Sequence, residues 1–554
     1  MASSAALRVP RPLLLSLVLA ALPVLVAGVG AETGGGPEPA PTGVPADAPR
    51  PTEPCPVQFT GSYVDGAAAW HEIPVVAQRK RAWEQSVGGK EAARPLIRAR
   101  LRGWPARLLV ERNELPSGER AFLERLARDA WRGLDALSDR ENGLPVDNVA
   151  VGRPAGAPSV RQVALGEGAG ERAGDGTHVG DYTNVTNIGL GLVAIVGAQE
   201  LGMLSREEAV ARTSRILDTL DRLETHRGYF FNFYDTTSLE RTSNFLSFVD
   251  LAWLTTGLVV ARRALPEVAE RATKLVDRMD FGFFYDRKLG QISHGYYVNR
   301  EVLSRYHYGV LFTEARLGVL LAIGKGDVPE DAWFRMARIF PRSCEGQTLE
   351  PRDVRRVSVQ GRDVLTGLYE WGGFRYVPSW GGSMFEALMP TLVLDELRYA
   401  PRSLGENGRV HAAVQERYAA TELRYPTWGL SPSASPDSDG YLEYGARVLG
   451  ARGYRAGALT PHAAALALAV RPAEAAAALR RFADEYPMYG EYGLYDAVDP
   501  TTREVAYRYL AVDQSMLFIA LANHLTGGAL QRHFASDGIV ARALPLIADE
   551  SFFP

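Results

Sequence analysis

The stretch Tyr308-Gly-Val-Leu-Phe-Thr-Glu-Ala-Arg-Leu-Gly-Val-Leu-Leu-Ala-Ile323 decides the fold. From Val310 onward its apolar residues occupy most sides of the expected helix, and a helix that is apolar all round is buried. Residues 188–195 have the same character. Buried helices in a chain of ordinary composition need other helices to shield them from water. The sequence therefore predicts two concentric layers of helices, with the inner layer covered by the outer one.

Helical spacing of apolar residues continues through most of the chain. In the segment 205–224, Ser205 and Glu208 form a capping box that marks a helix start, and Thr460-Pro461 marks another, with Pro in the first turn. The expected helices include 184–201, 205–224, 244–265, 308–323, 384–397, 462–470, 472–486, 510–525 and 530–546. The pattern predicts an all-α fold.

Composition excludes several classes of protein. The 554 residues carry 61 Lys+Arg against 65 Asp+Glu, which argues against a nucleic-acid-binding protein. With two Cys, no Cys-x-x-Cys, no His-Glu-x-x-His and no Gly-rich phosphate loop, the sequence predicts neither a metal nor a cofactor. Cys55 and Cys344 would form a disulfide outside the cytoplasm, or remain two free thiols.

The N-terminus is typical of an exported protein. Arg8 and Arg11 precede an apolar run over 13–29, and small residues follow, as in a secretory signal peptide. The alternative is an uncleaved membrane anchor. We expect a signal peptide over 1–31, a disordered Pro/Gly-rich linker over 32–58, an N-terminal extension over 59–118 and a helical domain over 119–554. After cleavage of the signal the protein would be secreted or periplasmic, with no stable membrane insertion.

Four loops are rich in aromatic residues and glycine, over 228–235, 290–297, 370–380 and 486–495. Exposed rings interspersed with Asp, Asn and Arg suit sugars, because the C–H faces of a sugar stack on rings while its hydroxyls need hydrogen bonds. The alternative is that these rings plug the ends of helices. We interpret the four loops together as a binding cleft for an oligo- or polysaccharide.

Three acids lie inside apolar stripes. Glu314, Asp250 and Asp513 each have apolar neighbours three and four residues away, on the same expected helix face. Burying an ionised carboxylate is costly unless it is paired or its pKa rises. A glycosidase gives one reason, because it needs a proton donor and a base or nucleophile. Pairing with an arginine such as Arg241 or Arg316, or capping of a neighbouring helix, is the structural alternative.

Further residues are candidates for binding sugar hydroxyls or faces. Glu386 lies in the capping box Ser383-Met-Phe-Glu386, so a local structural role is its default interpretation. The candidate substrate-binding residues are Asp235, Tyr234, Glu370, Trp371, Trp380, Glu386, Trp428, Glu443, Tyr492 and Asp496.

Several strings resemble the bacterial glycoamylase-like family, which includes endo-β-1,2-glucanases and the glycan-processing domain of cyclic β-1,2-glucan synthases. The most specific is Ser379-Trp-Gly-Gly-Ser-Met-Phe-Glu386, and the matches run in family order from about residue 144 to 526. The others are Thr186-Asn-Ile-Gly-Leu-Gly-Leu192, Phe231-Asn-Phe-Tyr-Asp235, Phe248-Val-Asp250, Tyr308-Gly-Val-Leu-Phe-Thr-Glu314, Tyr492-Gly-Leu-Tyr-Asp496 and Ala511-Val-Asp513.

The resemblance implies an (α/α)6 barrel with its site at the wide end. It also implies that Glu314 is the general acid, with Asp250 and Asp513 as base or substrate-orienting groups. The sequence departs from the family at Ala387, where a large aromatic residue is expected, and at Asp496, where Glu is common. Both changes bear on the choice of substrate.

Three functions follow from these observations. We expect an exported glycoside hydrolase or transglycosylase that acts on a β-glucan, with a β-1,2 linkage favoured. A non-catalytic glycan-binding or polysaccharide-assembly protein on the same barrel is the alternative. An anchored helical scaffold is a third possibility, and it requires that the N-terminal segment stays uncleaved.

Overall fold

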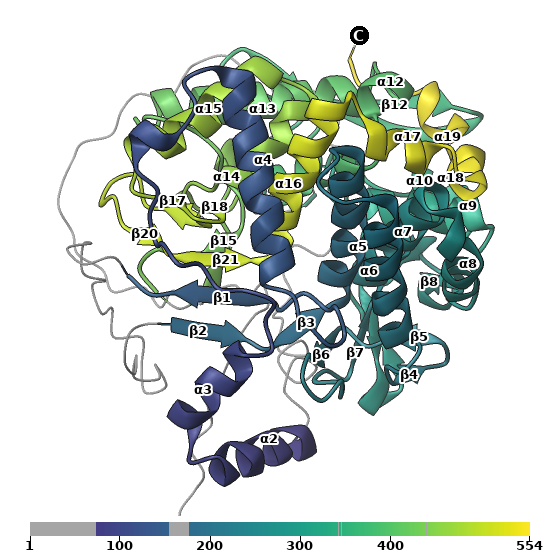
Figure 1. Ribbon diagram of the computed structural model, residues 1–554. Helices are drawn as coiled ribbons and strands as arrows, with labels where there is room; N and C mark the ends of the chain where they lie inside the picture. Colours follow the sequence, from purple (N-terminus) through teal and green to yellow (C-terminus); the bar gives the residue numbers. More distant parts are fainter. Residues whose placement is uncertain (1–73, 154–176, 342, 345, 439, 554) are drawn as a thin grey trace, which may run out of the picture.

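The computed structural model describes residues 74–153 and 177–553, except for residues 342, 345 and 439. The fold is predominantly helical, as predicted (Figure 1). It differs from an all-α fold because it also has two- and three-stranded sheets, many of which lie near one end of the central helices, whereas β12 (Arg352–Val359) lies beside α12 (Glu396–Tyr399) at the other end. The predicted signal peptide and linker, and Cys55, lie outside the described residues. Cys344 is disulfide-bonded.

The central helices are apolar on nearly every side. They are α5 (Val185–Glu200), α7 (Phe248–Ala264), α9 (Ala315–Lys325), α14 (Pro461–Leu466) and α16 (Ala511–Thr526), and most of their residues are buried. Helix α14 packs on α16, α16 on α5, α5 on α7 and α7 on α9. Such helices fold only because other elements remove all their faces from water.

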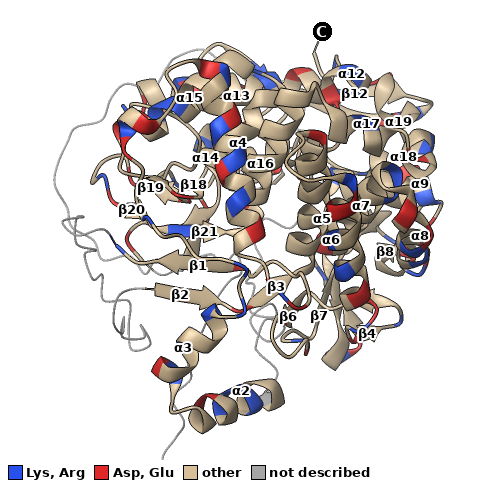
Figure 2. Cartoon of the chain, in the orientation of Figure 1, with Lys and Arg blue, Asp and Glu red and all other residues tan. Residues whose placement is uncertain are grey.

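More polar helices cover this group. Helix α4 (Glu119–Ala136) contacts α16, α6 (Arg206–Leu220) contacts α5, α8 (Ala269–Asp277) contacts α7, and α15 (Pro472–Glu485) contacts α14. Figure 2 shows charged residues along α4, α6 and α8, whereas α5 is almost free of them. The other helices are α11 (Met384–Leu388), α12 (Glu396–Tyr399), α13 (Leu404–Thr421), α10 (Asp331–Phe334), α17 (Ala529–Ala535), α18 (Gly538–Ala543) and α19 (Pro545–Ala548).

Helices α5 and α7 touch through their backbones. A Cβ atom added at Gly189 would lie 2.3 Å from the Trp253 carbonyl oxygen, and one added at Gly257 would lie 2.2 Å from the Gly189 carbonyl oxygen. Only glycine permits such an approach, because any side chain would separate the helices. The two glycines therefore fix the spacing of the most extensive helix pair in the fold.

The strands are antiparallel, and most of them are short. Strand β1 (Asn148–Val151) lies between β2 (Thr177–Gly180) and β21 (Arg508–Leu510), which joins distant parts of the chain. The pairs β3 (Tyr182–Asn184) with β6 (Phe233–Asp235), and β7 (Phe245–Ser247) with β10 (Gly295–Tyr297), lie below α5 and α7 in Figure 1. The remaining strands are β4 (Thr225–His226), β5 (Tyr229–Phe230), β8 (Tyr285–Asp286), β9 (Gln291–Ile292), β11 (Val302–Leu303), β12 (Arg352–Val359), β13 (Arg362–Trp371), β14 (Phe374–Tyr376), β15 (Ser433–Ala434), β16 (Tyr441–Leu442), β17 (Tyr489–Gly490), β18 (Gly493–Leu494), β19 (Ala497–Val498) and β20 (Val505–Ala506).

Three of the expected helices differ most from those observed. The segment 308–323 becomes helical only at Ala315, since residues 308–314 form an irregular loop. The segment 384–397 is broken into α11, a 3-10 turn (Met389–Leu392) and α12, because Pro390 cannot continue the helix ladder. The segment 530–546 is divided into α17, α18 and α19, with Pro545 at the start of the last.

The described part of the N-terminal extension begins with α2 (Pro74–Ser86) and α3 (Lys90–Arg98), at the end of the molecule where the strands gather (Figure 1). Ion pairs connect helix α2 to the rest of the protein. Lys80 Nζ lies 2.8 Å from Asp181 and 3.2 Å from Asp235, and Arg79 pairs with Glu240. Among the described residues, no helix combines the length and apolarity needed to cross a membrane.

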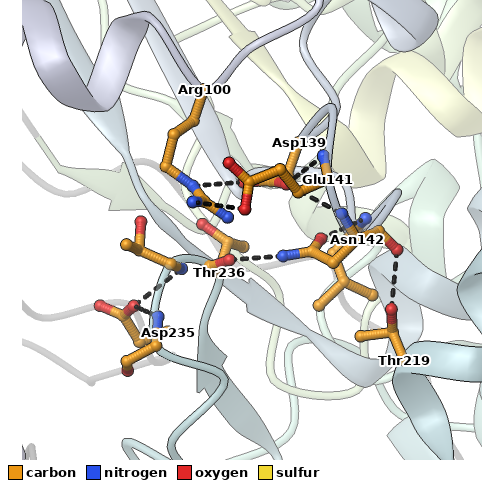
Figure 3. A network of polar contacts seen from close by, with 10 residues as sticks. Arg100, Asp139, Glu141, Asn142, Thr219, Asp235 and Thr236 are labelled. Carbon is orange, nitrogen blue, oxygen red and sulfur yellow. Dashed lines mark hydrogen bonds and ion pairs between the residues drawn. The ribbon is translucent and has the colours of Figure 1, made fainter.

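A polar network ties the extension to the helical body (Figure 3). Arg100 Nε lies 2.7 Å from an Asp139 carboxylate oxygen. Asn142 Nδ2 donates to the Thr236 carbonyl at 2.7 Å, and Thr219 Oγ1 donates to the Asn142 carbonyl at 2.9 Å. Since these groups are buried or half-buried, the network fixes the turn after α4 against α6 and the loop after β6.

Candidate active site

The three acids singled out above stand at the starts of central helices. Asp250 and Asp513 lie in the first turns of α7 and α16, and Glu314 immediately precedes α9. The prediction that each acid sits within a helical stripe was therefore wrong for its N-terminal half, because the preceding residues belong to strands β7 and β21 or to a loop. The positive end of a helix dipole favours a carboxylate there. That field opposes the cost of burial.

Two of these junctions contain no connecting residue. Strand β7 ends at Ser247 and α7 begins at Phe248, while β21 ends at Leu510 and α16 begins at Ala511. Strand pairing and the helix therefore fix the backbone on both sides of the junction. The strand pairing and the helix therefore also fix the position of the acid two residues further along the chain, which is Asp250 or Asp513.

Glu314 has the environment of a proton donor. Burial, and next the Glu386 carboxylate, raise the pKa of Glu314 to about 7. Its Oε2 atom is buried without a hydrogen-bond partner among the described residues. Arg316, which could have been a structural ion-pair partner of Glu314, pairs instead with Glu396, and its Nε donates to Glu396 Oε1 at 2.7 Å. A carboxyl group with a pKa near neutrality can both hold and release a proton at physiological pH.

Asp250 is held by two hydroxyl groups. Thr186 Oγ1, from the first turn of α5, donates to Asp250 Oδ1 at 2.7 Å, and the Asp250 N–H donates to Ser247 Oγ at 3.4 Å. Burial raises the pKa of Asp250, and the hydrogen bonds of Ser247 and Thr186 oppose that rise. Arg241, the other proposed arginine partner, pairs with Glu224 at 2.9 Å.

Asp513 is fully buried beside a second acid. Neither of its carboxylate oxygens has a hydrogen-bond donor among the described residues, and its carboxyl group contacts that of Asp496. Burial, and next the charge of Asp496, raise the pKa of Asp513 well above its usual value. Burial also raises the pKa of Asp496 to about 6. His462 Nδ1 lies 3.5 Å from Asp513 Oδ1.

Glu386 and Glu443 extend the acidic cluster around Glu314. Glu386 accepts hydrogen bonds from Ser379 Oγ at 2.9 Å and from the Gly381 N–H at 3.0 Å, and with Ser383 it forms the predicted capping box. Burial, and next the Glu386 carboxylate, raise the pKa of Glu443 to about 7. Glu386 thus organises a turn and also acts electrostatically on both neighbours.

The other predicted sugar-binding residues are dispersed. Tyr234 is in the core, where its hydroxyl donates to the Glu224 carbonyl at 2.7 Å, and Tyr492 is buried against Gly133 of α4. Asp235 accepts the N–H of Thr237 at 2.8 Å and pairs with Lys80, so it closes a turn.

Glu370 and the three candidate tryptophans, Trp371, Trp380 and Trp428, lie in three separate parts of the fold. Glu370 and Trp371 lie near the end of β13, where Glu370 is exposed and Trp371 packs edge-on against Tyr418. Trp380 is half-buried and precedes Gly381, whose N–H binds Glu386. Trp428 lines a pocket with Glu416 and Arg481. Among these aromatic residues, Trp380 is next to the acidic cluster.

Two residues near the acids were not proposed as site residues in the sequence analysis. They are Thr186, which binds Asp250, and His462, which faces Asp513. A threonine in the first turn of an apolar helix, and a histidine just after the helix-starting Pro461, were the available clues. Among the described residues, no group of three His, Cys, Asp or Glu side chains could hold a metal ion.

Comparison with known proteins identifies the class. Residues 364–537 match the family model named glycoamylase, described as putative glucoamylase. This part of the chain is therefore similar to the glycoamylase family, and the predicted resemblance is confirmed. The cyclic beta-(1,2)-glucan synthase NdvB of Rhizobium meliloti (strain 1021) is 30% identical over 305 residues, or 52% of this chain. The match covers only 10% of the length of that synthase.

Solved structures share the fold over about four-fifths of the chain. The endo-beta-1,2-glucanase from Chitinophaga pinensis, in complex with sophorotriose and glucose, has 17% identity and a TM-score of 0.59, covering 78% of this chain and 99% of that one. A putative glucoamylase from Bacteroides fragilis NCTC 9343 has 20% identity and a TM-score of 0.58, with 78% and 97% covered. The endo-beta-1,2-glucanase from Talaromyces funiculosus, in complex with sophorose, has 12% identity and a TM-score of 0.56, with 79% and 92% covered.

Proposed function

We propose that this protein is a glycoside hydrolase or transglycosylase that acts on a β-glucan with β-1,2 linkages. The observation that carries the proposal is the state of Glu314. It is a carboxyl group with a pKa of about 7, at the start of a central helix, with a buried oxygen that no described arginine or lysine pairs. A purely structural acid gains stability from a cationic partner, whereas a proton donor needs its proton.

In this mechanism Glu314 gives its proton to the glycosidic oxygen as the bond to the sugar carbon breaks. Asp513 or Asp250 takes a proton from the attacking water, directly or through a hydroxyl of the substrate. If a sugar hydroxyl attacks in place of water, the same steps transfer the glycan rather than hydrolyse it. The buried surroundings of Glu314 favour its protonated form, as a general acid requires.

The choice of β-glucan rests on the relatives. The synthase relative and two structural neighbours are named for β-1,2-glucan, and two neighbours were solved with fragments of such sugars. We also propose that the central helices form the inner ring of an (α/α)6 barrel over 119–554, with the acids at the end where these helices begin. Residues 1–31 would direct export.

Sugar contacts are assigned by proximity to the acids. We propose Trp380, Glu386 and Glu443 as the nearest substrate-binding groups, because the Glu386 carboxylate acts on both Glu314 and Glu443, and Trp380 precedes Gly381, whose N–H binds Glu386. Asp235, Tyr234, Glu370, Trp371, Trp428 and Tyr492 remain candidates for more distant subsites. Their side chains would need to become accessible where they are now buried.

The test is incubation of the protein with β-1,2-glucan and with other β-glucans, followed by analysis of product size. Glu314→Gln should lose at least a hundredfold of the turnover, which is the lower range for general acid catalysis, about 10²–10⁴-fold. Glu270→Gln, at an exposed position on α8, is the matched control and should retain full turnover. Binding of the glucan without any shortened, cyclised or transferred product would favour the non-catalytic alternative. Full activity of Glu314→Gln would remove Glu314 from the mechanism.

A further inference from the structure

The Asp496–Asp513 pair lacks the hydrogen atoms that two ionised carboxylates would need. Both oxygens of Asp513 and the Oδ1 of Asp496 are buried with no donor among the described residues. Only Asp496 Oδ2 receives one, from the Ala434 N–H at 2.7 Å. Because the two carboxyl groups contact each other, a proton on one of them would supply the missing donor and remove the repulsion between like charges.

His462 is a neutral neighbour of this pair. Thr460 has one hydroxyl hydrogen, and it is donated to the Asp496 carbonyl at 2.6 Å. The 2.8 Å contact between Thr460 Oγ1 and His462 Nδ1 therefore places a hydrogen on Nδ1. The same N–H faces Asp513 Oδ1 at 3.5 Å. Burial lowers the pKa of His462 to about 3, so the ring is neutral and cannot cancel a second negative charge.

We propose that Asp496 and Asp513 share a single proton, and that Asp496 is a positioning residue that sets the pH range in which Asp513 acts as a base. This proposal deepens the proposed function and rests on it. The pair begins each cycle with one proton and one negative charge. Asp513 takes a second proton from the attacking water or sugar hydroxyl as its own proton passes to Asp496, and the pair returns one proton to the Glu314 carboxylate or to solvent after the glycosidic bond has broken.

The other groups around the pair fit one negative charge. Asp513 faces His462, and it also faces Asp147, which immediately precedes β1, and Tyr441 of β16. Arg508, from β21, favours the charged form of Asp496, as does the Ala434 N–H. Asp147 is bound by Asn148 and Asn187 amides, both at 3.1 Å. These contacts bias the charge toward Asp496 and the proton toward Asp513 in the resting protein.

Asp496→Asn tests the proposal, because the amide keeps the shape and can still accept the Ala434 N–H. The first measurement is the infrared absorption of protonated carboxyl groups during a pH titration, with the Asp513 band identified by its loss in Asp513→Asn. In Asp496→Asn the midpoint of that band should fall by at least one pH unit, since a neutral amide no longer repels the ionised form of Asp513. The control is Asp499→Asn, three residues along the chain, whose carboxylate binds the Thr501 N–H at 2.7 Å. It should leave the midpoint unchanged.

The second measurement is the pH dependence of kcat/KM on β-1,2-glucan. Its acidic limb follows uptake of the second proton by the pair, which depends on the ionised Asp496, so in Asp496→Asn, where Asp513 is the only base left and burial still raises its pKa, the limb should move to higher pH. An unchanged infrared midpoint would overturn the shared proton. A raised KM with an unmoved acidic limb would show Asp496 to be a sugar ligand instead. If no glucan is cleaved, the proposed function fails, and the infrared midpoint still decides whether the proton is shared.

Discussion

The backbone contact between α5 and α7 allows a prediction in which two expected effects have opposite signs. In Gly189→Ala the new Cβ would lie 2.3 Å from the Trp253 carbonyl oxygen and 2.8 Å from the Leu254 Cα, whereas ordinary contacts fall at 3.4–4 Å. The two helices would have to separate by about 1 Å, and we expect a loss of about 1–3 kcal/mol in the free energy of unfolding. Helix propensity alone would give the reverse, a gain of about 1 kcal/mol.

Gly191→Ala is the matched control in the same helix. The nearest atom to its new Cβ is Pro145 Cγ at 3.9 Å, so only the gain in propensity remains, about 0.5–1 kcal/mol. Equilibrium unfolding in urea of the wild type and both variants measures the difference. If Gly189→Ala proved as stable as Gly191→Ala, the argument that this glycine sets the helix spacing would be refuted.

The same separation would disturb the candidate site. Thr186, three residues before Gly189, holds Asp250 at 2.7 Å across the α5–α7 contact. A displacement of about 1 Å can cost about 100-fold in rate when it misplaces a reacting group. We expect a loss of that order in glucan cleavage for Gly189→Ala, and none for Gly191→Ala. Equal cleavage by both folded variants would show that Asp250 does not depend on this spacing.

The remaining predictions concern charge. The pKa of Glu314 in the folded protein, about 7, lies above the ordinary value of 4.5, so the wild type loses stability as the pH rises through this interval. Glu314→Gln should therefore have a higher Tm than the wild type above pH 7 and the same Tm near pH 4. An equal Tm at every pH would contradict the raised pKa. In the wild type, kcat should fall about tenfold per pH unit above pH 7 as Glu314 ionises, and a flat profile up to pH 9 would contradict its role as the acid. Lys80→Ala should make α2 more sensitive to limited proteolysis by leaving Asp181 unpaired, and high salt should do the same to the wild type; unchanged cleavage would show that other contacts hold α2. Arg316→Ala should destabilise the protein by about 3–5 kcal/mol in urea unfolding, because it leaves the buried Glu396 carboxylate without its cationic partner. A loss below about 1 kcal/mol would argue against that pair.

The sequence predicted the elements unevenly. It predicted well the helices that are buried on every side, and poorly the loops and short strands. Apolar periodicity located α5, α7 and α16 within a few residues, because burial on every side leaves few other solutions. The start of α9 was missed, since the apolar run through Val310 and Leu311 looks helical but belongs to a loop. Short strands of two or three residues have too little periodicity to be recognised in a single sequence.

The candidate site was predicted unevenly for a similar reason. An isolated acid among apolar residues is visible in one segment, so Glu314, Asp250 and Asp513 could be singled out. Contacts between distant segments are not visible. The pairing of Asp496 with Asp513 and of Lys80 with Asp235 depends on how the chain closes on itself. Likewise, many of the rings in the aromatic loops, such as Tyr234, are buried in the core, which only the packed structure reveals.

The direct passage from β7 into α7 and from β21 into α16 has a consequence for how this scaffold can change. One inserted residue at either junction would rotate the following acid by about 100° about its helix axis, because an α-helix has 3.6 residues per turn. Lengthening at either junction would therefore displace the candidate catalytic acids Asp250 and Asp513 themselves. Longer hairpins such as β12–β13 carry no such constraint. Diversification of substrate choice, natural or engineered, should accordingly accumulate in those hairpins while the spacing at the helix starts stays invariant.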